Sequence, residues 1–250
     1  MSKDDFFIGW SPDMPKGDRR AFLATGAALV SGAAIGAGVL ASRQRPAGNG
    51  TWAMGDVREW TGVATAEPYA MLRTLDDDGR PRTLQLACLD KCGVAARINS
   101  YQGQHVTVKG SLIERGPHGM IAVIDGMDWI APAGETLSTS LVFPEIEILG
   151  EVDLSGEILD TKCWFGAMRP SEGKVHKSCA SLCIRGGLPP GFYVKAPQDQ
   201  SALMIMTDSG LGHSDAILPY VADPVRVRGT LQRWGDLYLL DAPASAISRI

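Results

Sequence analysis

VTVKGSL, at residues 106–112, decides the fold that we expect, because it returns as VRVRGTL at residues 225–231. In both copies apolar and polar residues alternate up to a glycine, which is the period of a β-strand with one buried face. The two copies lie 119 residues apart. A strand repeated at that distance predicts two structural units of similar design.

The sequence around both copies favours further strands. Short apolar runs are separated by turn-forming phrases such as DDDGRP, YQGQ and GPHG, a pattern typical of antiparallel strands. The phrase V-x-V-x-G-[ST]-L resembles the central strand of an OB-type barrel, where glycine permits a sharp bend. The resemblance implies two small OB-like β-barrels, at residues 56–130 and 146–250, joined by a linker at 131–145.

The second barrel is expected to carry an insertion. Gly62 and Gly156 are matching landmarks upstream of the repeated strand, and their offset is 94 residues instead of 119. The second copy therefore holds about 25 extra residues, close to the length of the cysteine-rich stretch at residues 157–191. We expect this insertion to carry the chemistry, because loops on a rigid scaffold usually do.

Four residues of the insertion form a candidate metal site. Cys163, His176, Cys179 and Cys183 have the spacing C-x12-H-x2-C-x3-C. A short helix is predicted over the last three, since Gly186-Gly187 and Pro189-Pro190 follow as stop signals. Positions i, i+3 and i+7 share one helix face, so these three side chains would point the same way, with Cys163 closing a fourth corner.

Three thiolates and one imidazole suit zinc, copper or iron, and Met168 can add a soft ligand to copper. A disulfide or thiol redox pair, or inert structural cysteines, remain open alternatives. Cys88 and Cys92 are interpreted as independent of each other. The alternatives are a vicinal redox pair or a pair that completes a site with the second barrel. Lys162 is expected to face solvent.

The N-terminal part favours a membrane anchor. Residues 21–41 contain no charge and are long enough for a transmembrane helix, which we expect to remain uncleaved. Gly32 and Gly36 form a G-x-x-x-G pair, which predicts close packing against a helix of an integral membrane protein.

Asp18-Arg19-Arg20-Ala21-Phe22-Leu23, directly before this helix, resembles a bacterial twin-arginine export signal. The resemblance implies a cytoplasmic N-terminus at residues 1–20, a single pass through the bacterial inner membrane and a periplasmic C-terminal part. Residues 42–55 are rich in glycine, proline, arginine and asparagine, a composition that predicts a linker.

Composition narrows the function. The net charge of −4 argues against nucleic-acid binding, and the usual hydrolase and nucleotide-binding motifs do not occur. The layout of anchor, β-domain and metal element resembles Rieske-type subunits, although their cluster-binding boxes are missing. We therefore predict a non-catalytic accessory subunit of a respiratory or electron-transfer membrane complex. The alternative is a metal- or thiol-dependent oxidoreductase or electron-transfer protein.

Overall fold

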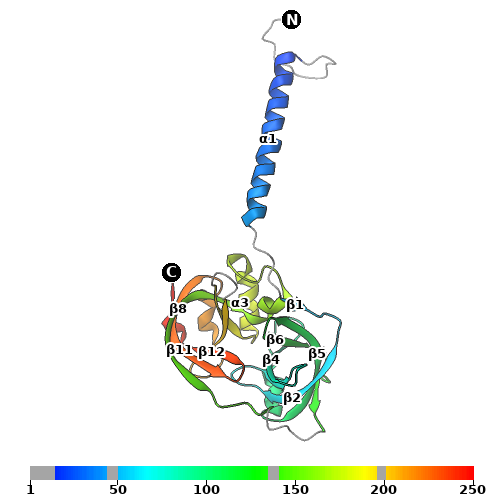
Figure 1. Cartoon of the computed structure of the whole chain (residues 1–250), viewed down its shortest axis with the longest axis vertical. Coiled ribbons are helices and arrows are strands. Elements are labelled where there is room, and N and C mark those ends of the chain that lie inside the picture. Colours follow the sequence, from blue (N-terminus) through cyan, green and yellow to red (C-terminus); the bar gives the residue numbers. More distant parts are fainter. Residues whose placement is uncertain (1–14, 44–49, 135–140, 196–200) are drawn as a thin grey trace. The chain divides into compact units, whose positions relative to one another are not determined.

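The computed structural model describes residues 15–43, 50–134, 141–195 and 201–250 (Figure 1). Two compact units are present, residues 1–47 and 48–250. The first holds one helix, and the second holds two β-barrels. Residues 1–14 of the predicted cytoplasmic segment, and 44–49 and 135–140 of the two predicted linkers, lie outside the described residues.

Helix α1 runs from Lys16 to Arg43. The predicted transmembrane helix at residues 21–41 is wrong, because no helix in the described part of the chain is both long enough and apolar enough to cross a membrane. Composition explains the error. Twelve of these 21 residues are alanine or glycine, which have little or no apolar side-chain surface. The helix is therefore long enough to cross a membrane but not hydrophobic enough.

The first barrel is a closed ring of five strands. They are β2 (Arg58–Thr65), β3 (Met71–Leu75), β4 (Pro81–Ala87), β5 (His105–Arg115) and β6 (His118–Val123). They pair in the order β2-β3-β4-β6-β5 and back to β2, with β4 and β6 parallel and the other pairs antiparallel. The short strands β1 (Thr51–Trp52) and β7 (Ile130–Pro132) also pair with β5. Helices α2 (Ala95–Ile98) and η1 (Asn99–Tyr101) connect β4 to β5.

The second barrel repeats this plan. Its strands are β8 (Glu147–Asp160), β9 (Pro190–Val194), β10 (Ala202–Thr207), β11 (Pro224–Trp234) and β12 (Leu237–Asp241). They close in the order β8-β9-β10-β12-β11, again with one parallel pair, β10 and β12. β13 (Ile247–Arg249) pairs with β11, and two short helices, η5 (Asp215–Tyr220) and η6 (Ala244–Ala246), lie between strands. The chain is thus mainly β, with two closed five-stranded barrels.

The two barrels agree in register as well as in strand order. Gly62 on β2 pairs with Val106 on β5, and Gly156 on β8 pairs with Val225 on β11. The glycine of the repeated phrase is needed for close strand approach: a Cβ on Gly110 would lie 2.4 Å from the carbonyl oxygen of Ala122. The same contact recurs in the second barrel, where Gly229 faces the backbone of β12.

The barrels differ at the connection between their first two strands. In the first barrel residues 66–70 join β2 to β3, whereas in the second residues 161–189 join β8 to β9. This longer connection contains η3 (Cys163–Ala167), η4 (Lys174–His176) and α3 (Lys177–Arg185). It is the cysteine-bearing segment, which we call the insertion.

The insertion is buried against both barrels. Trp164, Phe165 and Leu188 of the insertion share one apolar cluster with Ile113 and Met120 of the first barrel. Residues of the second barrel complete that cluster: Leu159, Tyr193 and Leu203. Because the insertion is packed on two sides, its side chains are held by contacts remote in sequence.

Candidate metal centre

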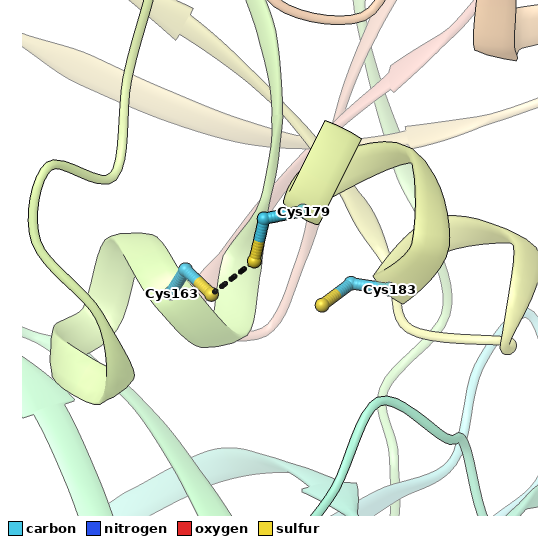
Figure 2. A group of neighbouring side chains, drawn as sticks. All are labelled: Cys163, Cys179 and Cys183. Atoms are coloured by element: carbon cyan, nitrogen blue, oxygen red, sulfur yellow. Dashed lines mark hydrogen bonds between the residues drawn. The ribbon is translucent and has the colours of Figure 1, made fainter. Parts of the chain in front are cut away.

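Three cysteine thiols meet in the insertion. The Sγ atoms of Cys163, Cys179 and Cys183 all lie within 4.8 Å of one another, and those of Cys163 and Cys179 are 3.9 Å apart. Figure 2 shows the three side chains pointing toward a common space. Cys163 and Cys183 are buried and Cys179 is half-buried, so the cluster reaches the surface on the Cys179 side.

The local sequence explains this arrangement. Helix α3 ends at Arg185 with Gly186 as its C-cap, as the stop signals predicted. Cys179 and Cys183 are four residues apart on this helix and therefore occupy one face. Cys163 begins the π-helical turn η3, and its N–H donates to Asp160 Oδ1 at 2.8 Å. A carboxylate three residues before an amide satisfies an otherwise free donor of the first turn, as in a helix N-cap.

Asp160 also holds His176. The two side chains are buried, and His176 Nε2 lies 2.9 Å from Asp160 Oδ2. Asp160, Cys163 and His176 form a second group whose ligand atoms all lie within 4.8 Å of one another. Asp160 thus orients both the turn that carries Cys163 and the imidazole, a supporting role common around metal ligands.

The four residues predicted as ligands are therefore divided between two overlapping groups. Cys163 belongs to both, Cys179 and Cys183 to the thiol group, and His176 to the group with Asp160. Among the described residues, no group whose ligand atoms all lie within 4.8 Å of one another contains all four predicted ligands. Either group can hold a metal ion, and the three thiols are the softer donor set.

A loop of the first barrel lies against the thiol group. It contains a disulfide between Cys88 and Cys92, so the interpretation of these cysteines as independent is wrong. Lys91, between them, places its Nζ 2.7 Å from Cys179 Sγ and 3.9 Å from Cys183 Sγ. The four-residue spacing brings the Cα atoms of the two cysteines to 5.5 Å, a separation that a disulfide can bridge.

Lys162 ties this loop to the insertion. Its Nζ donates to the carbonyl oxygens of Cys88, Leu89 and Asp90 at 2.6, 2.7 and 2.6 Å. The residue is only 3 % exposed, so the expectation that it faces solvent is wrong. Three carbonyls match the three donors of an ammonium group, which allows the charge to be buried.

Electrostatics distinguishes the thiols. The Cys163 thiol donates a hydrogen bond to Cys183, which raises the pKa of Cys163, and burial and the Asp160 charge raise it further. The same hydrogen bond lowers the pKa of Cys183, against the effect of burial, and the Lys91 charge lowers it too. Burial lowers the pKa of Lys162, while the Cys183 and Cys163 thiolates oppose that effect. Of the two buried thiols, Cys183 is therefore the one whose thiolate is favoured.

Cys163 is suited to metal binding and poorly suited to nucleophilic catalysis. A nucleophilic cysteine needs an accessible thiolate. Cys163 is the cysteine next to the Asp160–His176 pair, yet it is buried and its thiol form is favoured. Metal binding has no such difficulty, because an ion replaces the thiol protons and stabilises several thiolates at once.

Comparison with protein-family models and with curated proteins finds no match to this chain. Function is therefore inferred from the geometry of the site.

Sequence reasoning missed two residues of this site. Lys91 stands between two cysteines, and a lysine is a residue type that stabilises nearby thiolates. Asp160 precedes Cys163 by three residues, the spacing of a side chain that caps a turn. Neither signal reveals that the loop and the insertion meet, since that contact joins the two barrels.

Proposed function

We propose that this protein is a metal-binding accessory protein that holds one thiophilic metal ion through Cys163, Cys179 and Cys183. The observation that carries the proposal is the convergence of three thiols within 4.8 Å. Three sulfur donors suit zinc, copper or iron, whereas magnesium and calcium require oxygen ligands. Asp160 supports the site through the amide of Cys163, at 2.8 Å.

Burial supports a binding role. With Cys163 and Cys183 enclosed, only the Cys179 side is open to another molecule. Such a site suits holding an ion, or passing an ion or an electron, better than converting a substrate. As predicted from the sequence, we propose that the chain is a non-catalytic subunit of a respiratory or electron-transfer membrane complex.

Export is proposed on two grounds. The Arg19-Arg20 pair resembles a twin-arginine signal, and the Cys88–Cys92 disulfide suits an oxidising compartment such as the bacterial periplasm. The predicted helix partner at Gly32 and Gly36 stays a prediction.

Thiol redox chemistry is the second candidate. The 3.9 Å between the Cys163 and Cys179 sulfurs supports it, because a modest movement would bring them to bonding distance. Closing that bridge oxidises two thiols to one disulfide and needs an acceptor for two electrons and two protons, such as a partner disulfide, which would be reduced to two thiols.

Metal analysis of the full-length chain, combined with mapping of free thiols, tests the two candidates together. We expect about one metal ion per chain, and most of it lost in Cys163→Ser, Cys179→Ser and Cys183→Ser, because each removes a donor atom. The matched control is the double variant Cys88→Ser with Cys92→Ser, which removes two cysteines outside the thiol group and should keep the metal.

His176→Gln measures the contribution of the second group. Near-complete loss of metal would support the four-ligand set predicted from sequence, whereas a partial loss would fit a residue that positions Cys163 through Asp160. A chain that binds no metal and carries a Cys163–Cys179 bridge would reject the metal proposal in favour of thiol redox chemistry.

A further inference from the structure

A methionine stands beside the thiol group on its open side. Met168 follows η3, and its Sδ lies 3.5 Å from Cys179 Sγ. The side chain is 44 % exposed, so burial of apolar surface does not explain its position well. The thioether is instead placed where a fourth sulfur ligand would complete the three thiols.

An open cleft leads to this methionine. It has a volume of about 430 Å³ and is lined by residues of two segments, 50–54 and 166–169. Met54, which is 72 % exposed, is a second thioether on its wall. Arg169 joins the two segments by donating to the Gly50 carbonyl oxygen, so the walls are tied together next to the thiol group.

We propose that the site is selective for Cu(I), with Met168 as the fourth ligand and Met54 on the path by which the ion reaches it. This inference rests on the proposed metal-binding function and names the ion. Thioether sulfur is a soft donor that favours Cu(I), and it is a poor ligand for the harder divalent ions.

The donors around the thiols support this choice over zinc or iron. The imidazole of His176, a ligand that zinc favours, is grouped with Asp160 and Cys163 and is not within the same spacing of Cys179 and Cys183. The atom that does approach the thiol group is the Met168 sulfur, 3.5 Å from Cys179 Sγ.

The test is an anaerobic titration of the full-length reduced protein with Cu(I) against a competing Cu(I) chelator, and with Zn(II) against a competing zinc chelator. We expect one Cu(I) per chain. Met168→Leu should weaken Cu(I) binding by about tenfold or more, on the scale of changes around metal sites, and leave Zn(II) binding unchanged. Met54→Leu should slow loading with Cu(I) and leave the affinity unchanged.

The matched control is Met127→Leu, which replaces an exposed methionine, 62 % accessible, that does not line the cleft. It should change neither affinity nor loading rate. X-ray absorption of the copper-loaded protein should show four sulfur neighbours in the natural chain and three in Met168→Leu. Thermal unfolding of each variant shows whether it is folded.

The outcomes separate the two proposals. If neither ion binds, the proposed metal-binding function fails. If Zn(II) binds through the cysteines and Met168→Leu has no effect on Cu(I) affinity, metal binding stands and the Cu(I) inference is overturned. Equal loading rates for Met54→Leu and the natural chain would overturn the access path.

Discussion

At the scale of single residues, charged and polar groups are buried where they are paired. Lys162 has three carbonyl acceptors and Asp160 accepts from an amide and from His176, so each meets the requirements of a buried polar group. His118 and His213 are different. Burial is the main cause that lowers the pKa of both imidazoles.

These two histidines predict loss of stability in mild acid. The unfolded chain binds a proton at the ordinary histidine pKa, whereas the folded state, with lowered pKa values, does not. Their contribution is therefore fully present above the ordinary pKa and is lost as the pH falls below it toward the folded values. We expect a lower unfolding temperature at about pH 5 than at about pH 7.

Replacing both histidines isolates this effect from that of the carboxylates. The double variant His118→Gln with His213→Gln should show a smaller difference in unfolding temperature between the two pH values, measured by circular dichroism. An unchanged difference would contradict the assignment to these residues.

At the scale of elements, the insertion and the disulfide loop fit together through glycines. Gly93 N–H donates to the Gly186 carbonyl oxygen at 2.7 Å, and a Cβ on Gly186 would lie 1.9 Å from the carbonyl oxygen of Lys91. Only glycine at the C-cap of α3 permits this approach. The contact holds Lys91 over the thiols.

Gly186→Ala is expected to separate the loop from the insertion. The added methyl group must displace the backbone of Lys91, which we expect to lower the free energy of unfolding by about 1–3 kcal/mol. Cys179 should become more reactive toward a thiol reagent, because its covering lysine moves away.

Gly134→Ala is the matched control, since a Cβ there meets nothing within 4 Å. Denaturant unfolding and the rate of thiol labelling measure both effects. If Gly186→Ala labels no faster than the natural chain, the loop does not cover Cys179 as described.

At the scale of the whole molecule, the two barrels are joined by apolar and polar contacts. One apolar cluster combines Met71 of the first barrel with Ile205 and Leu239 of the second. Asp236 accepts from the backbone N–H and the hydroxyl of Thr83, at 2.8 and 2.6 Å, and from Arg73 at 3.2 Å. We therefore expect the barrels to unfold together.

Asp236→Ala tests the polar part of this interface. The change leaves the Thr83 amide and the buried Arg73 without that acceptor, and we expect a loss of about 1–3 kcal/mol in unfolding free energy. The exposed pair of Asp78 and Arg80 supplies the control, because Asp78→Ala should cost little. Both variants should keep a single calorimetric transition. Two separate transitions in the natural chain would show that the barrels are not energetically coupled.

The sequence by itself determined the repeated strand and the stop of helix α3, because each depends on local periodicity or on glycine and proline at fixed positions. It predicted an insertion at residues 157–191, and in the structure the corresponding connection between β8 and β9 spans residues 161–189. The transmembrane prediction for α1 was wrong because it rested on length and on the absence of charge. Alanine and glycine contribute too little apolar surface to make this helix sufficiently hydrophobic. Only the tertiary structure decided which donors meet. His176 joins Asp160, Met168 approaches Cys179, and Lys91 arrives from the other barrel, since side chains remote in sequence are brought together by the packing of the insertion against both barrels.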